Sequence, residues 1–146
     1  MRKIDCIIIH CSASDNLTHD SFKAIYELHI SPKKEKFLWG NYHTTGKGFT
    51  DIGYHFIVCH DGSIYIGRPI EKIGAHCKGQ NGNSIGICLT GNKIFSEKQF
   101  QSAIKLCKLL ITLLGLKKID VIGHRMFNNN KTCPNFDVTE KIGRYL

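Results

Sequence analysis

The sequence predicts one α/β domain spanning residues 1–146, with a central mixed β-sheet of about five strands flanked by helices. Two observations predict this class. Short apolar runs rich in β-branched residues alternate with segments in which apolar residues recur at the spacing of a helix. The chain also has 146 residues, of which 42% are apolar and 22% charged, and this size and composition suit a single hydrophobic core.

The first fifty residues predict a strand, a helix and a loop. Ile4–His10 is an apolar run, typical of a strand that is buried on both faces. Thr18–His29 carries apolar residues at helical spacing, with Thr18 or Asp20 as the expected N-cap. Ser31–Phe49 is rich in Pro, Lys, Gly, Asn and Thr, so we expect a long loop there.

Three further strands are predicted in the middle of the chain. Gly53–His60 and Ser63–Arg68 are β-rich, and the intervening pair Asp61-Gly62 is a strong signal for a two-residue hairpin. Ser84–Leu89 is another apolar run, with Gly and Asn residues on both sides of it. We therefore expect a hairpin followed by a buried strand.

The last third of the chain predicts a helix, a short strand and a final helix. Ser96-Glu97-Lys98-Gln99 matches a capping box, and Gly115 is placed to end the helix that the box begins. Asp120–Gly123 predicts a fifth strand, and Asp137–Leu146 predicts a C-terminal helix. The apolar face of the longer helix comprises Phe100, Ile104, Cys107, Leu110, Ile111 and Leu114.

The net charge of +8 indicates attraction to an anionic partner, such as nucleic acid, a membrane surface or the acidic polymers of a bacterial cell wall. The lysines are dispersed apart from one denser patch, Lys33-Lys34-Glu35-Lys36, so general solubility explains the charge at least as well as a dedicated site. The sequence has no recognised nucleic-acid motif and no apolar stretch long enough for a membrane span. Charge alone does not identify the partner.

Seven cysteines in an odd count, with no CxxC pair, indicate a reducing compartment rather than a disulfide framework. Cys6 and Cys88 lie inside apolar runs, where a free cysteine acts as a small hydrophobe in the core. Near the N-terminus, Asp5 and His10 interrupt the apolar stretch that follows the first basic residues. We therefore expect no signal peptide and synthesis in the cytoplasm.

Three residues are of the types that zinc prefers as ligands. His10 ends the first apolar run, His124 ends the run that begins at Val121, and Cys133 follows nine residues after His124. Ligands at strand ends are held rigidly, and the neighbouring Pro134 stiffens the backbone of Cys133. Three protein ligands leave a coordination position for water and hence for hydrolysis, so the pattern is typical of a zinc hydrolase.

Each of these ligands has an ordinary alternative explanation, because a single histidine at a strand end is usually just a polar residue and a single cysteine usually packs in the core. The sequence segments around these residues favour the metal site over the ordinary alternatives. In this order along the chain, they are Ile8–Ala13, Asp51–Ile57, His60–Gly62, Gly67-Arg68, Gly74–Gly79, Asn83–Leu89 and Lys131–Asp137. Together these segments resemble the N-acetylmuramoyl-L-alanine amidases of the phage T7 lysozyme type, which are related to peptidoglycan recognition proteins.

The resemblance implies one zinc ion held by His10, His124 and Cys133, in an amidase/peptidoglycan recognition protein-like fold. It implies cleavage of the amide bond that joins N-acetylmuramic acid to the L-alanine of the stem peptide. It also places Tyr54 and Lys131 as catalytic partners, consistent with the need for a hydrogen-bonding or positive group beside a developing oxyanion. Without the resemblance, Tyr54 would be read as a core aromatic and Lys131 as a solvated loop lysine.

Alternation along a strand would place Tyr54 and Phe56 on one face and His55 on the other, so we expect Tyr54 in the site and His55 as a hydrogen-bonded structural residue. The resemblance places His76 at the border of the substrate groove, where a substrate contact and an exposed loop position are equally good explanations. The remaining histidines are expected to be structural or surface residues, with His29 the least certain: His19, His29, His43 and His60.

Two features depart from the wider family. Many of its amidases carry a carboxylate near the zinc on the strand that corresponds to Ser84–Gly91, and this chain has none there. Proton handling would then fall to Tyr54, Lys131 and the zinc water. The Ser31–Gly48 stretch is also longer than the corresponding T7-type loop, and it forms either a mobile surface loop or a lip that contacts glycan or polyanion through Lys33, Lys34, Lys36, Trp39 and Tyr42.

The resulting hypothesis is a monomeric peptidoglycan amidase, a phage-type endolysin or related bacterial lytic protein, that acts on the cell wall after release. A non-catalytic peptidoglycan-binding module is an alternative, disfavoured because such family members typically lack the thiolate that Cys133 provides. Regulation of a phage RNA polymerase is a further role that the resemblance implies, although no residue in the sequence identifies such an interface.

Overall fold

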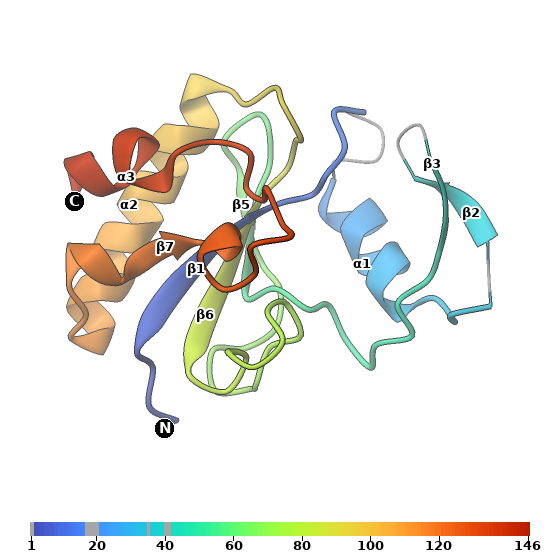
Figure 1. Ribbon diagram of the computed structural model, residues 1–146, viewed down its shortest axis with the longest axis horizontal. Helices are drawn as coiled ribbons and strands as arrows, with labels where there is room; N and C mark the ends of the chain where they lie inside the picture. Colours follow the sequence, from blue (N-terminus) through green and yellow to red (C-terminus); the bar gives the residue numbers. More distant parts are fainter. Residues whose placement is uncertain (1, 17–20, 35, 40–41) are drawn as a thin grey trace.

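Five strands among the residues that the structure describes form one mixed sheet in the order β5–β4–β6–β1–β7 (Figure 1). The structure is a computed structural model and describes residues 2–16, 21–34, 36–39 and 42–146. β5 pairs antiparallel with β4, and the other neighbours in the sheet pair in parallel. The predicted mixed sheet is therefore confirmed. Its strands are β1 (Cys6–Cys11), β4 (Phe56–Val58), β5 (Ile64–Ile66), β6 (Ser84–Leu89) and β7 (Val121–Gly123).

Helices cover both faces of this sheet (Figure 1). The long helix α2 (Glu97–Leu114) and the short helix α3 (Val138–Lys141) lie on one side, and α1 (Phe22–Ile30) lies on the other. Single 3-10 turns at Lys118–Asp120, His124–Met126 and Gly143–Tyr145 complete the helical elements of the described residues. None of the helices described is long and apolar enough to cross a membrane.

The alternation of side chains along β1 and β6 separates the core from the functional face. Ile7 and Ile9 of β1, with Ile85 and Ile87 of β6, are fully buried against the apolar face of α2. The residues between them point to the opposite face of the sheet: Ile8 and His10 on β1, and Ser84, Gly86 and Cys88 on β6. Because β1 lies inside the sheet between β6 and β7 and both faces of the sheet are covered, His10 lies on a rigid strand that is buried along its whole length.

The local signals for α2 are confirmed. Ser96 accepts a hydrogen bond from the Gln99 amide, and the Gln99 side chain accepts one from the Ser96 amide, so the predicted capping box is present. Gly115 ends the helix with φ of 67°, a left-handed conformation that glycine adopts without strain.

The prediction of a long loop after α1 was wrong. Lys36–Trp39 forms β2 and Tyr42–Thr45 forms β3, and the two pair antiparallel as a separate hairpin. The chain after β3 then returns to α1, because the amides of Lys47 and Phe49 donate to carbonyls at its C-terminal end. Proline and lysine obscured a pattern in which Phe37, Leu38 and Thr44 are ordinary strand residues.

Several predicted boundaries also need correction. Helix α1 begins at Phe22 and is capped by the Ser21 side chain, whereas the expected caps Thr18 and Asp20 lie outside the described residues. The predicted strand Gly53–His60 is regular only from Phe56, and the predicted C-terminal helix is one short helix followed by a 3-10 turn.

Candidate metal centre and active site

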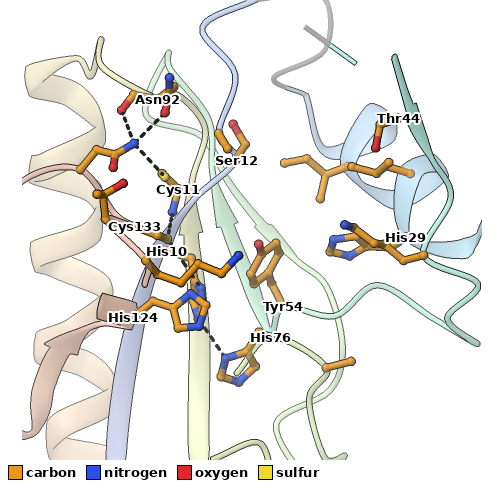
Figure 2. A pocket seen from close by; sticks show the side chains of 18 of the residues that line it. His10, Cys11, Ser12, His29, Thr44, Tyr54, His76, Asn92, His124 and Cys133 are labelled. Atoms are coloured by element: carbon orange, nitrogen blue, oxygen red, sulfur yellow. Dashed lines mark hydrogen bonds between the residues drawn. The ribbon is translucent and has the colours of Figure 1, made fainter. Parts of the chain in front are cut away.

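Parallel pairing brings the two candidate histidine ligands to the same edge of the sheet. Ile8 of β1 pairs with Ile122 of β7. His10 comes two residues after Ile8, and His124 comes two residues after Ile122, so the two histidines follow the paired strands at equivalent positions. Both side chains therefore point to the face opposite α2. Their ring centroids lie 4.5 Å apart, and Figure 2 shows the two rings side by side at this edge.

Cys133 reaches the two histidines from the loop that follows β7. Its carbonyl accepts a hydrogen bond of 2.9 Å from the Arg125 amide, which ties this loop to the 3-10 turn that contains His124. The amide of Cys11, at the end of β1, lies 3.3 Å from the Cys133 Sγ. The same sulfur lies 4.0 Å from Nδ1 of His10. One ligand atom from each of His10, His124 and Cys133 lies within 4.8 Å of the others.

The donor set suits zinc. Burial, followed by the neighbouring histidines, lowers the pKa of His10 well below 6.5, and burial also lowers the pKa of His124, so both rings are neutral and can donate a lone pair near pH 7. The pKa of Cys133 is raised, first by its hydrogen bond with Cys11 and then by burial. Binding of a metal cation displaces the proton of a thiol, so Cys133 would bind zinc as a thiolate. The separation of 4.0 Å between the His10 Nδ1 and the Cys133 Sγ is close to the value of about 3.6 Å expected for two such ligands on a tetrahedral ion.

Tyr54 lies beside this group. Its ring centroid is 5.2 Å from that of His10 and 5.2 Å from that of His29, so the phenol stands between the sheet and α1 (Figure 2). Burial, followed by the nearby Cys88, Cys133 and Cys11, raises the pKa of Tyr54 well above 10. The phenol is therefore protonated at neutral pH, and its hydroxyl has Cys88 as a hydrogen-bond partner.

Tyr54 lines the pocket, but the reason expected from strand alternation was wrong. Phe56 packs in the core against α2, whereas Tyr54 packs with Ile57 on the opposite face of the sheet. Tyr54 and Phe56 thus do not share a face, because regular alternation begins only at Phe56. His55 is fully buried, and its Nδ1 accepts a hydrogen bond of 3.0 Å from the Gly86 amide, as expected of a structural histidine.

The three ligands and Tyr54 line a pocket of about 530 Å³, a size typical of ligand sites. Lys131 lies at this pocket with an exposed side chain, and Lys47 approaches from the segment after β3. No Asp or Glu occurs among the described residues that line it, so the pocket is positively charged and has no carboxylate base. This agrees with the absence of an acidic residue on β6.

Two features of the site were missed from the sequence, and one further prediction stays untested. Part of the stretch expected to be a loop forms the far wall of the pocket through Thr44, Lys47 and Phe49. The side chains of Trp39 and Tyr42, expected in a contacting lip, lie outside the described residues, and Lys33, Lys34 and Lys36 are exposed. Cys11 contacts Cys133, a proximity that pairing of strands far apart in sequence creates and that local pattern does not reveal.

His76, expected at the groove border, lines the pocket but faces His10. Its Nδ1 lies 3.0 Å from Nε2 of His10, and its Nε2 lies 3.4 Å from Oγ of Ser84. Both ring nitrogens are therefore engaged by protein groups. A substrate contact by His76 stays a prediction.

Comparison with known proteins agrees with this fold. The family model described as N-acetylmuramoyl-L-alanine amidase matches residues 1–136. The chain therefore belongs to the N-acetylmuramoyl-L-alanine amidase family. The family resemblance, the fold and the class of enzyme that were predicted from the sequence are therefore confirmed.

Individual relatives include phage and animal proteins. The endolysin of Escherichia phage T7 is 34% identical over 142 residues, which cover 92% of this chain and 82% of that protein. Peptidoglycan-recognition protein SC2 of Drosophila melanogaster is 45% identical over 105 residues, 69% of this chain and 56% of that protein. Among solved structures, the endolysin N-acetylmuramoyl-L-alanine amidase LysCS from Clostridium intestinale has a TM-score of 0.76 at 27% identity, covering 96% of this chain and 82% of that chain.

Proposed function

We propose that the chain is a zinc-dependent endolysin-type amidase that hydrolyses the bond between N-acetylmuramic acid and the L-alanine of the peptidoglycan stem peptide. The observation that carries this proposal is the grouping of His10, His124 and Cys133 within 4.8 Å at the edge of a pocket. Membership of the amidase family supports the reaction class. The similarity to a phage endolysin supports peptidoglycan as the substrate.

The three side chains would hold zinc through two neutral nitrogens and one thiolate. When bound, such an ion supplies a Lewis acid and makes a water molecule acidic enough to attack a carbonyl near neutral pH. In the net reaction, water adds to the lactyl carbonyl carbon, the bond from that carbon to the alanine nitrogen breaks, and the nitrogen leaves as a free amine after taking up a proton.

Tyr54 and Lys131 would act on the two charges that develop during this reaction. The Tyr54 phenol stays protonated and lies next to His10, so it can donate a hydrogen bond to the carbonyl oxygen as negative charge builds there. Lys131 brings a positive charge to the mouth of the same pocket. Since no carboxylate occurs among the described residues that line the pocket, we take these two groups as the candidates for stabilising charge and moving protons.

The decisive experiment is digestion of purified peptidoglycan followed by mass spectrometry of the products. We expect a new amino terminus on L-alanine, loss of the product after treatment with a chelator, and its return when zinc is added. Tight binding of muropeptide without any new amino terminus would instead support the non-catalytic recognition module. The contact with RNA polymerase stays a prediction, since none of the described residues and none of the comparisons bears on it.

Replacing Tyr54 with phenylalanine is expected to lower kcat by about 10²–10³-fold, the effect of removing one donor from an oxyanion site. The ring remains to fill its place beside His10, so zinc affinity should stay at the wild-type value. Steady-state kinetics on a soluble muropeptide and zinc titration by competition with a chromophoric chelator measure both quantities. Lys131→Ala tests the second group in the same way. Lys98→Ala, which removes an exposed lysine of α2, is the control for loss of a lysine.

A wild-type kcat in both the Tyr54 and Lys131 variants would contradict these roles while leaving the metal site intact.

A further inference from the structure

We propose that His76 is a positioning residue for the metal centre, which fixes His10 in the tautomer that carries its proton on Nε2 and presents Nδ1 to the metal. This inference rests on the proposed function for the role of the metal. It concerns a residue that lines the pocket but whose two ring nitrogens are both directed at other protein groups.

The direction of the hydrogen bonds follows from the far end of the chain of contacts. Ser84 Oγ lies 2.6 Å from the carbonyl oxygen of Gln80, which can only accept, so the single hydroxyl proton of Ser84 is donated there. Ser84 Oγ can then only accept from His76, whose Nε2 lies 3.4 Å away. His76 therefore carries its proton on Nε2 and has a lone pair on Nδ1.

The same logic continues to His10. Since His76 Nδ1 accepts, the contact of 3.0 Å requires that His10 donate its Nε2 proton. A neutral imidazole has only one ring proton, so Nδ1 of His10 then carries a lone pair. That nitrogen is the one 4.0 Å from the Cys133 sulfur, which is the side of the ring where a shared ion would lie.

The His76 ring is held in place by a slot that only glycine backbone can form. A Cβ added at Gly86 would come within 2.5 Å of the His76 ring, and one added at Gly74 would also come within 2.5 Å of it. The backbone of His76 is fixed as well, because Asn81 Oδ1 accepts from the amides of His76 and Cys77 at 2.8 Å each. Two glycines and a side-chain clamp thus set the orientation of this one imidazole.

A hydrogen-bond acceptor on the second ring nitrogen of a metal-binding histidine has a known physical effect. A histidine that donates its second ring proton is a stronger and better-oriented metal ligand, and loss of the acceptor typically lowers metal affinity by about 10–100-fold. Tyr54 and His124 also lie beside the His10 ring, with centroid separations of 5.2 Å and 4.5 Å, whereas the hydrogen-bond contact of His10 Nε2 is with His76. His76 is therefore the group that distinguishes the two nitrogens of His10.

The tautomer is tested directly, without metal or activity, by two-bond ¹H–¹⁵N NMR of the chelator-treated protein. We expect the wild-type His10 to carry its proton on Nε2. In His76→Phe, which keeps a ring in the glycine slot but has no nitrogen, we expect both tautomers to be populated. A wild-type His10 protonated on Nδ1 would overturn the inference.

Zinc affinity provides the second measurement. We expect His76→Phe to raise the Kd for zinc about 10–100-fold, and His76→Asn, whose amide oxygen replaces Nδ1 as an acceptor, to stay within about fivefold of wild type. His60→Phe, which replaces a histidine outside the pocket, is the matched control and should bind zinc as the wild type does. Equal affinity in wild type, His76→Phe and His76→Asn would refute the positioning role.

A pair of serine variants checks the far end of the chain of contacts. Ser84→Ala should weaken zinc binding several-fold, whereas Ser102→Ala removes a hydroxyl that makes the same 2.6 Å bond to a backbone carbonyl away from the pocket, and it should leave zinc binding unchanged. Equal losses in both would assign the effect to general destabilisation and contradict the inference. If the wild type bound no zinc, the proposed function would fail, while the NMR experiment would still decide the tautomer of His10.

Discussion

Cys133→Ala is expected to abolish zinc-dependent amide hydrolysis. The substitution removes the one ligand that becomes an anion, leaving two neutral imidazoles to hold a divalent cation. We expect zinc affinity to fall by more than about 100-fold, beyond the effect of losing a supporting hydrogen bond. The loss of the ion should lower kcat/KM by at least about 10³-fold, equivalent to roughly 4 kcal/mol of transition-state stabilisation.

The same variant separates chemistry from folding. Cys133 is only partly buried, and its Sγ has the Cys11 amide as a neighbour at 3.3 Å, so the chelator-treated variant should unfold close to the wild-type temperature. Cys6→Ala is the matched control, because Cys6 is buried at the opposite end of β1 and should lose packing energy without losing zinc. Retention of zinc and of wall lysis in Cys133→Ala would contradict the metal site.

The parts of this molecule that could be predicted from sequence are those governed by local rules. The capping box at Ser96, the stop at Gly115 and the strand Ser84–Leu89 each depend on residues within a few positions of one another, and each is found as expected. The three candidate ligands could be named because two of them end apolar runs. Their actual proximity depends on the parallel pairing of β1 with β7, which brings positions more than a hundred residues apart into register.

The failures have an equally physical cause. The segment that forms β2 and β3 contains lysines and follows Pro32, so its composition resembles that of a loop although its backbone pairs. The Gly40-Asn41 pair in its sequence is a two-residue hairpin signal that the prediction of a loop overlooked. The role of His76 depends on Ser84, Gly86 and Gly74, which lie on a strand and in a loop that come together only in the folded chain. The glycines were visible in the sequence, but the ring that they accommodate was not.

Acid is expected to destabilise the zinc-free protein progressively below pH 6.5, through histidines that are buried and neutral. Burial, as the largest cause, lowers the pKa of His29 to about 4 and that of His55 to about 4. Each ring accepts a backbone hydrogen bond on Nδ1, His29 from the Gly53 amide at 2.9 Å and His55 from the Gly86 amide at 3.0 Å. Protonation of Nδ1 in either histidine would place its new N–H donor against the backbone N–H donor.

The sign follows from the two states. In the unfolded chain these histidines bind a proton below about pH 6.5, whereas in the folded chain they do so only near pH 4, so the unfolded state binds more protons between these values. The contribution of these two histidines to stability is therefore constant above pH 6.5 and falls as the pH drops towards 4, by about 1.4 kcal/mol per pH unit for each histidine. His76, whose pKa is lowered to about 3, and His10 act in the same direction.

The size of the effect makes it measurable. Two histidines acting over about two pH units remove roughly 5 kcal/mol, which is comparable with the entire stability of many domains. Urea unfolding in the presence of a chelator at several pH values between 8 and 4.5 measures the slope.

His29→Asn supplies an amide oxygen near the position of Nδ1, so it keeps an acceptor for the Gly53 amide while removing the titration. We expect its slope between pH 6 and 4.5 to be lower by about 1.4 kcal/mol per pH unit, and its slope between pH 7 and 8 to match the wild type. If the two proteins lost stability at the same rate below pH 6, His29 would not be among the groups that make the fold sensitive to acid.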